Sequence, residues 1–279
     1  MNLQQRRVLS EGEVSRYHED GLLIPKYRLP ADVLADIQRL LGELIARNPE
    51  VPQELLLNCN VEDGSLGGVR GDRAFLRFAA YPPLLDVLEQ VLGPDIILWD
   101  VAIICKPPKV GKGIPWHQDS PYFVKIHPIE TATIWIAIDG AWPDNGCMKF
   151  IPGLHKKGIL NHVRVDDVDP DVLLGFETSV DPAVLEEEKA RPVILEPGEF
   201  CVFSAHCPHS STPNTSGRRR GALILRYMSG SSVYDDTKVG LLESKGEPVD
   251  PIGRPIFLMR GQDRTGRNVL TELPPAARA

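Results

Sequence analysis

The chain has 279 residues, of which 42% are hydrophobic and 25% are charged, and its formal net charge is -7. This composition is ordinary for a globular protein and excludes extensive disorder. The negative charge argues against a nucleic-acid partner, because proteins that bind nucleic acid present a basic surface to the phosphates.

The cysteines and the N-terminal sequence favour a cytoplasmic location. Five cysteines form an odd set without a C-x-x-C pair, which is typical of a reducing environment. The first residues, MNLQQRRVLSEGE, lack the apolar core of a signal peptide, and no apolar run approaches the length of a membrane span. We therefore expect a cytoplasmic protein without a membrane partner.

The first third of the chain predicts helices. Ser10 and Glu13 form a capping-box pattern before a short helix that Gly21 would end. Apolar residues at helical spacing from Pro30 to Asn48 predict a longer helix with one buried stripe. After a polar stretch, 58–73, that is long enough to be a functional loop, a third helix is expected at 83–92.

From residue 95 onward, short apolar or alternating runs bounded by Gly, Pro or Asn-Gly predict strands rather than helices. The clearest are Ile96–Lys106, Thr131–Asp139, Arg191–Glu196, Glu199–Ser204 and Gly221–Met228. Short strands joined by turns favour a sandwich or a barrel. The turn signal at 196–199 predicts a hairpin, and the acidic segment 166–189 is either a solvated loop or a lid over the barrel mouth. The tail from Leu273 is expected to be loose.

The stretch IPWHQDSPYF places His117 and Asp119 two residues apart in an extended segment. Side chains alternate along a strand, so both would project from one face. A histidine and a carboxylate are two of the three ligands that bind non-haem Fe(II), and the third would be a distant histidine. Because H-x-D is frequent by chance, a surface turn or an imidazole–carboxylate hydrogen bond is an alternative explanation.

Two of the seven histidines, His206 and His209, directly follow a strongly predicted strand. Arg220 comes eleven residues after His209, at the start of another strand. Several motifs occur in a characteristic order around these residues. They are Trp116-His117-Gln118-Asp119, Trp135, Asn145-Gly146 followed by Pro152-Gly153-Leu154-His155, Pro197-Gly198-Glu199, and His209 to Asn214 followed by Arg220.

This set of motifs resembles the phytanoyl-CoA dioxygenase family of Fe(II)/2-oxoglutarate oxygenases over nearly the whole chain. The resemblance implies a mainly β fold with flanking helices, a double-stranded β-helix (jelly-roll, cupin-like) barrel. It implies a single domain over 1–279, with N-terminal helices at about 10–93, the β-helix core at about 94–230 and a C-terminal extension at 231–279. Its cofactor and cosubstrates would be Fe(II), 2-oxoglutarate and O2.

The resemblance also assigns roles residue by residue. The iron ligands would be His117, Asp119 and His209, with His155 structural and His206 excluded because the family spacing counts from His209. Arg220 would pair with the distal carboxylate of 2-oxoglutarate, since a guanidinium offers a planar, two-pronged donor. Three further residues match positions that contact the cosubstrate, although each has a structural alternative: Lys106 (a solvated strand end), Trp135 (core packing) and Ser211 (a turn residue).

Retention of Asp119 points to oxygenation, because related halogenases replace this carboxylate with a small residue. The expected reaction is hydroxylation, or a related oxidation, of a small molecule with release of succinate and CO2. The residues after Asp119 argue against ectoine, and no basic patch is evident for coenzyme A, which leaves a small metabolite, a phosphonate or a natural-product intermediate. Two alternatives are a catalytically silent jelly-roll binding protein and a Zn(II) cupin-like isomerase or hydrolase with the same three ligands.

Overall fold

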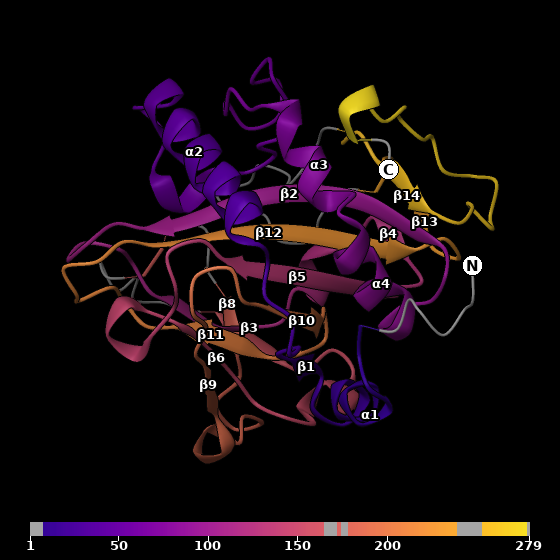
Figure 1. Ribbon diagram of the computed structural model, residues 1–279. Coiled ribbons are helices and arrows are strands. Elements are labelled where there is room, and N and C mark those ends of the chain that lie inside the picture. Colours follow the sequence, from indigo (N-terminus) through magenta and orange to yellow (C-terminus); the bar gives the residue numbers. More distant parts are fainter. Residues whose placement is uncertain (1–7, 165–171, 174–177, 239–252, 278–279) are drawn as a thin grey trace.

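The computed structural model describes residues 8–164, 172–173, 178–238 and 253–277. Two antiparallel sheets face each other, and helices α2 and α3 cover the larger sheet on the side away from the smaller one (Figure 1). The helices are α1 (Glu11–Asp20), α2 (Ala31–Arg47), α3 (Leu76–Ala79) and α4 (Pro82–Val91). The mainly β fold with flanking helices is thus confirmed.

The larger sheet has six strands and the smaller sheet has four. In spatial order, the larger contains β1 (Leu22–Leu23), β10 (Phe200–Ser204), β5 (Thr131–Ala137), β12 (Arg220–Ser229), β2 (Ile96–Lys106) and β14 (Phe257–Arg260). The smaller contains β3 (Ile114–His117), β11 (His209–Ser211), β6 (Met148–Phe150) and β9 (Arg191–Val193). Two further pairs join β13 (Val233–Tyr234) to β4 (Ile126–His127), and β7 (His162–Arg164) to β8 (Thr178–Val180).

The expected helix signals are present. The side chains of Ser10 and Glu13 form a capping box at the start of α1, and Gly21 ends the helix in the left-handed conformation with φ 83°. In α2, the residues buried against the larger sheet lie on one stripe: Ile37, Leu40, Leu41 and Leu44. The short helix α3, within the segment that follows the polar stretch, was not predicted, because four residues are too few to show a helical period.

Alternation along β12 divides the core into two layers. Leu223 and Leu225 face the helices and belong to the largest apolar cluster. Ala222 and Ile224 face the smaller sheet and pack with Trp135 and Phe203. The space between the two sheets is therefore lined by every second residue of β12.

Two predictions about local structure are wrong. The turn at 196–199 forms, with the Glu199 amide donating to the Glu196 carbonyl at 3.0 Å, but it does not join a hairpin. Strand β9 pairs with β6 in the smaller sheet and β10 pairs with β1 and β5 in the larger, so the turn is a corner between sheets. The tail from Leu273 is also not loose, because Ala277 is buried in the main core beside α3.

Candidate active site

The smaller sheet and the turn after β3 bring the three candidate metal ligands together. His117 at the end of β3 lies directly opposite His209 at the start of β11, and their ring centroids are 4.1 Å apart. Asp119 Oδ1 lies 3.7 Å from His117 Nε2 and 3.9 Å from His209 Nε2. All three side chains are buried.

The path to Asp119 differs from the sequence prediction. Strand β3 ends at His117, and Asp119 has helical dihedral angles (φ -71°, ψ -30°) at the start of a 3-10 turn. The two side chains therefore converge because the chain bends after the strand, and not because they alternate along it. Gln118 stabilises this bend from the opposite side: its amide donates to the Gly158 and His206 carbonyls and accepts from the Leu160 amide.

Backbone hydrogen bonds select the tautomer of both histidines. His117 Nδ1 lies 2.9 Å from the Pro115 carbonyl, and His209 Nδ1 lies 3.0 Å from the Cys207 carbonyl. Each Nδ1 therefore donates, and Nε2, which faces Asp119, carries the lone pair. Burial, and then the charge of His209, lowers the pKa of His117 to about 3, so its imidazole is neutral, as metal coordination requires.

The donor set fits Fe(II). Two imidazole nitrogens and one carboxylate oxygen lie within 4.8 Å of one another, which is the composition of the facial triad that leaves coordination positions open. Within the described part of the chain, this is the only group of three or more His, Cys, Asp or Glu side chains that could hold a metal. His206 does not belong to it. His155 lies instead against the end of α1, where a Cβ on Gly21 would be 2.5 Å from its ring.

A cluster of buried basic side chains lies at one end of the inner face of the larger sheet, and we call it the pocket because it is the proposed binding site for a carboxylate. Arg220 on β12 and Lys106 on β2 are direct partners in the sheet and are only 2% and 0% exposed. Lys106 Nζ donates to Ser211 Oγ at 2.7 Å and to the Thr212 carbonyl at 2.6 Å. The guanidinium of Arg220 lies 5.3 Å from the ring centroid of Trp135 on β5. Lys106, Trp135, Ser211 and Arg220 thus come together from four strands, β2, β5, β11 and β12.

The electrostatics of this pocket favour an anion. Burial lowers the pKa of Arg220 to about 10, and burial together with the positive charge of Arg220 lowers the pKa of Lys106 to about 6. Arg220 Nε is a buried donor that has no hydrogen-bond partner in the structure. A buried charge is costly unless it is paired, so a carboxylate that entered the site would pair with Arg220 and would favour the charged form of Lys106.

Two residues of the sequence motifs support the pocket from behind. Asn214 Nδ2 lies 2.7–3.2 Å from three carbonyl oxygens, those of Lys106, Pro107 and Arg218. Gly146 has φ 79°, and a Cβ there would lie 2.5 Å from the Thr212 carbonyl and 3.3 Å from Lys106 Nζ. Only glycine fits this close approach, which explains why these residue types accompany the pocket.

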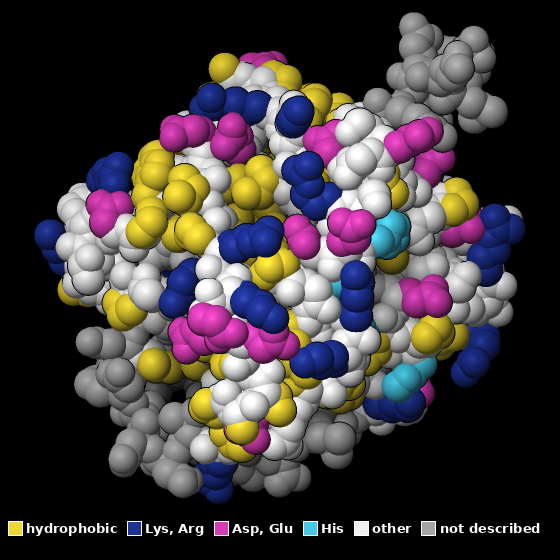
Figure 2. Space-filling view, turned by 90° about the horizontal axis from the view of Figure 1, so that it is seen from below, with side chains coloured by type: hydrophobic (Ala, Val, Ile, Leu, Met, Phe, Trp, Pro, Cys, Tyr) yellow, Lys and Arg dark blue, Asp and Glu magenta, His cyan; other side chains and the backbone are white. Residues whose placement is uncertain are grey.

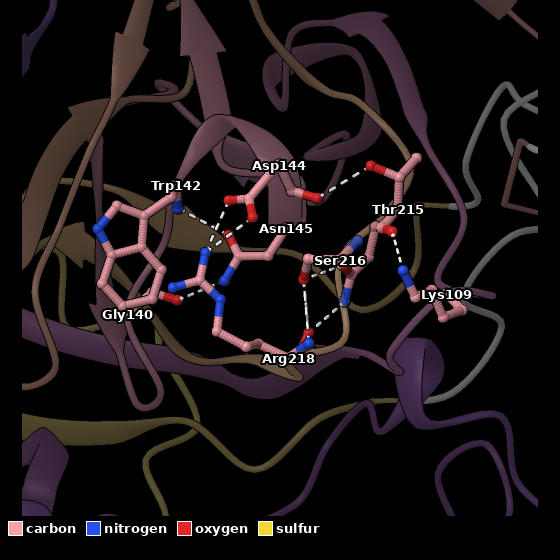
Figure 3. Close-up of polar contacts among 9 residues, drawn as sticks. Lys109, Gly140, Trp142, Asp144, Asn145, Thr215, Ser216 and Arg218 are labelled. Atoms are coloured by element: carbon pink, nitrogen blue, oxygen red, sulfur yellow. Dashed lines mark hydrogen bonds and ion pairs between the residues drawn. The ribbon is translucent and has the colours of Figure 1, made fainter.

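The loop that precedes Arg220 is tied to the neighbouring loop at the surface (Figure 3). Both carboxylate oxygens of Asp144 accept from Arg218 at 2.8 Å, and the guanidinium of Arg218 covers the ring of Trp142 at 4.5 Å. The Thr215 hydroxyl donates to the Asp144 carbonyl. These exposed contacts connect the loop after β11 to the loop after β5, and they hold the start of β12 in place.

The segment expected to cover the barrel mouth is described in part, since 165–171 and 174–177 lie outside the described residues. The Leu173 amide donates to the Gly113 carbonyl, and the Ser179 hydroxyl donates to the Trp116 carbonyl. Trp116 Nε1 donates to Glu187. The described part of the segment therefore lies against β3, the strand that ends at His117.

Sequence reasoning missed one pair of residues in the site. Arg226 Nε lies 3.8 Å from Asp119 Oδ2, and Arg226 also forms an ion pair with Asp100. The signal was available, because alternation from Arg220 along β12 places Arg226 on the same inner face.

The exterior carries mixed charges. On the face shown in Figure 2, Lys and Arg side chains are interspersed with Asp and Glu, and hydrophobic side chains lie between them, so this face has no extended basic patch. Among the described helices, none combines the length and apolar character needed to cross a bilayer. All five cysteines are buried and unpaired.

Solved structures with low sequence identity share the fold. A non-heme monooxygenase, ThoJ, in its apo form superimposes with a TM-score of 0.70 at 20% identity, over 94% of this chain and 88% of that one. The alpha-ketoglutarate-dependent carbocyclase SnoK from nogalamycin biosynthesis superimposes with a TM-score of 0.62 at 18% identity, over 89% and 96%. These likenesses confirm the jelly-roll, cupin-like fold.

Sequence relatives point to one family. Methylphosphonate hydroxylase of Gimesia maris is 33% identical over 144 residues, which are 51% of this chain and 49% of that protein, so the alignment spans about half the length of each. Peroxisomal phytanoyl-CoA dioxygenase of Homo sapiens is 27% identical over 262 residues, with 85% of this chain and 71% of that protein covered. Residues 17–222 match the family model of phytanoyl-CoA dioxygenase (PhyH), and the chain therefore belongs to the phytanoyl-CoA dioxygenase family.

Proposed function

We propose that this protein is an Fe(II)- and 2-oxoglutarate-dependent dioxygenase that hydroxylates, or otherwise oxidises, a small molecule, with release of succinate and CO2. The observation that carries the proposal is that β11 links a buried His-Asp-His group to a buried arginine–lysine pair: it holds His209, and its Ser211 binds Lys106. Among the described residues, no carboxylate forms an ion pair with Arg220 or Lys106, although Glu54 lies close enough to interact with both charges. A metal that must be chelated by a dicarboxylate needs both features. The site requires Fe(II), 2-oxoglutarate and O2.

Each residue has a distinct role in the proposal. His117, Asp119 and His209 hold the metal, and the iron supplies the oxidative chemistry once it is bound. Arg220 anchors the distal carboxylate of 2-oxoglutarate by a two-pronged contact. Lys106 and Ser211 border the same pocket and bind one another, and Trp135 covers the guanidinium. Burial of the whole group excludes water from the site.

The substrate in this proposal is a small molecule. Relatives named methylphosphonate hydroxylase and 2-aminoethylphosphonate dioxygenase support this class, at 33% and 26% identity over about half of this chain. Their alignments include only part of each protein, so the substrate itself is not transferred. Oxidation at a carbon is the reaction that agrees with retention of Asp119.

A Zn(II) isomerase or hydrolase would use the same three ligands but has no need of a buried Arg220. Anaerobic reconstitution with Fe(II) and 2-oxoglutarate, followed by air and a panel of metabolites, separates the two. We expect substrate-dependent succinate with Fe(II) and none with Zn(II). Succinate that is absent with every substrate, while Zn(II) supports turnover of one, would contradict the proposal.

Ligand variants test the same assignment. His117→Ala and Asp119→Ala should abolish succinate formation while the circular dichroism spectrum stays that of the wild type, because the ligands bind metal and do not form the core. Lys149→Ala, on neighbouring β6, is the control and should remain active. Near-normal coupled succinate formation in both ligand variants would refute the iron assignment.

A further inference from the structure

The two oxygens of the Asp119 carboxylate face different partners. Oδ1 faces the Nε2 atoms of both histidines, whereas Oδ2 lies 3.8 Å from Nε of Arg226. Asp119 Oδ2 and Arg226 Nε are both buried polar atoms without a hydrogen-bond partner in the structure. An acceptor and a donor of opposite charge therefore face each other just beyond hydrogen-bonding distance.

Arg226 is held in place from its far end. It lies on β12 directly opposite Asp100 of β2, and its Nη1 donates to Asp100 Oδ2. Arg254 binds the other oxygen of the same carboxylate. Asp100 is only 5% exposed, and the ring of Phe123 lies 5.9 Å from the Arg226 guanidinium. This ion-pair chain leaves Nε, in the middle of the side chain, as the donor nearest to Asp119.

The two inward arginines of β12 thus serve different places. Arg220 lies at the Lys106 end of the strand, where no described carboxylate binds it, and six residues later Arg226 lies between Asp119 and Asp100. The first arginine is suited to a ligand that arrives from outside. The second already has the Asp100 carboxylate at its Nη1 atom and the Asp119 carboxylate near its Nε atom.

We propose that Arg226 is a positioning residue for Asp119, donating through Nε to Oδ2 so that only Oδ1 is presented to the metal. This inference rests on the proposed metal site. A carboxylate with both oxygens unrestrained can chelate a metal through two positions, whereas a facial triad needs one position per residue to keep the remainder open. Outer partners of this kind orient ligands and tune the metal.

The test is Co(II) binding by the apoprotein. It is measured by anaerobic titration and followed by visible absorption spectroscopy. Arg226→Met should raise the Co(II) dissociation constant about ten-fold or more, in the range found when outer partners of ligands are removed, and should alter the ligand-field bands. Arg226→Lys keeps the charge opposite Asp100 but has no donor at the Nε position, so it should raise the constant several-fold.

Arg260→Met is the matched control. Arg260 is 20% exposed at its side chain, against 17% for Arg226, and it binds two carboxylates, Asp86 and Glu89, on the outside of the sheet. This variant should change neither the dissociation constant nor the bands. If Arg226→Met does not fold, as judged by circular dichroism, Arg226→Lys decides the question.

If the Arg226 variants have the Co(II) dissociation constant and the ligand-field bands of the wild type, the inference is overturned. A raised KM for substrate with unchanged Co(II) binding would overturn it as well, because Arg226 would then contact the substrate and not the ligand. Failure of the proposed function has a different signature: the wild type itself would not bind Co(II), or His209→Ala would bind it equally well.

Discussion

Arg218, Arg219 and Arg220 are consecutive, yet each has a different environment. Arg218 binds Asp144 at the surface, and Arg219 forms two hydrogen bonds with Asp139 on the helix side of the sheet. Arg220 is buried on the inner face. A run of three arginines would ordinarily be explained as a solvated turn, and alternation at the start of β12 is what separates the third from the other two.

This difference predicts the effect of Arg220→Lys. Lysine cannot reproduce the two-pronged contact with a carboxylate. A hydrogen bond to a charged group contributes about 1.5–3 kcal/mol, so the KM for 2-oxoglutarate should rise by about one to two powers of ten. Arg219→Lys, which removes a two-pronged contact with Asp139 outside the pocket, should leave this KM unchanged. Equal, small effects in steady-state kinetics would mean that the cosubstrate is anchored elsewhere.

His206 and His209 form a second matched pair at the residue scale. His209 Nε2 faces Asp119. His206 lies outside the candidate metal group, and it is the backbone carbonyl of His206, not its imidazole, that accepts from the Gln118 amide. His209→Ala should therefore lose Fe(II), measured by anaerobic equilibrium dialysis, while His206→Ala retains Fe(II) and at least partial activity. The reverse pattern would identify His206 as the third ligand.

Lys106 predicts a pH dependence of stability in the absence of cosubstrate. Its folded pKa of about 6 lies below the ordinary lysine value, so between about pH 6 and pH 10 the unfolded chain binds the additional proton. The destabilisation by buried Lys106 is complete below pH 6 and decreases as the pH rises. As the pH rises across this window, the free energy of unfolding of the wild type should therefore increase relative to that of Lys106→Met. The increase should be up to about 1.4 kcal/mol per pH unit.

Urea titrations of both proteins at pH 6.5, 7.5 and 8.5 measure this difference. Parallel stability curves would show that Lys106 keeps its charge in the folded protein. Added 2-oxoglutarate should make the stability difference between the two proteins less dependent on pH, because a carboxylate beside Lys106 favours the charged ammonium.

At the scale of elements, β2 and β12 carry the proposed cosubstrate pocket, and their ends are held by loops. Gly146 lets the loop after β5 approach Thr212 and Lys106 more closely than any side chain would allow. The two strands supply Lys106 and Arg220, but the loop decides where the lysine ammonium lies. Loop and strand therefore act together on the pocket.

Gly146→Ala should both destabilise the protein and weaken cosubstrate binding. Gly67→Ala is the matched control, since Gly67 has φ 80°, close to the 79° of Gly146, but no atom within 4 Å of an added Cβ. The control should lose about 1 kcal/mol from the left-handed conformation alone, with an unchanged KM for 2-oxoglutarate. Gly146→Ala should lose more and raise this KM. Equal changes in stability and in KM for the two variants would show that the loop does not contribute to cosubstrate binding.

At the scale of the whole molecule, the site joins the two sheets. The smaller sheet provides His117 and His209, and the larger sheet provides Lys106, Trp135 and Arg220. The helices cover the opposite face of the larger sheet and enclose the main apolar core. The core is thus separate from the site, and ligands that bind the site bridge the two sheets.

Metal binding should consequently stabilise the entire fold. A ligand at about one hundred times its dissociation constant stabilises the native state by about 2.7 kcal/mol, which corresponds to a rise in Tm of about 5–10 °C for a domain of this size. Calorimetry with Mn(II) should show this rise in the wild type, its reversal by a chelator, and no rise in His209→Ala. An equal rise in that variant would place the metal elsewhere.

The sequence by itself determined the features that depend on neighbours along the chain. The capping box at Ser10 and the buried stripe of α2 are both local patterns with a fixed spacing. The ordered motifs from Trp116 to Arg220 added the family resemblance, and with it the candidate metal ligands His117, Asp119 and His209, because metal binding requires particular residue types.

Only the tertiary structure decided which distant segments meet. It placed β9 and β10 in different sheets although a tight turn joins them, and it moved Asp119 off the strand that ends at His117. It also brought Arg226 to Asp119 and Asp100, which lie far from it in the sequence. Turn chemistry and strand period are the same for a hairpin and for a corner between sheets, so local patterns do not distinguish them. The choice depends on which pairing buries the most apolar surface.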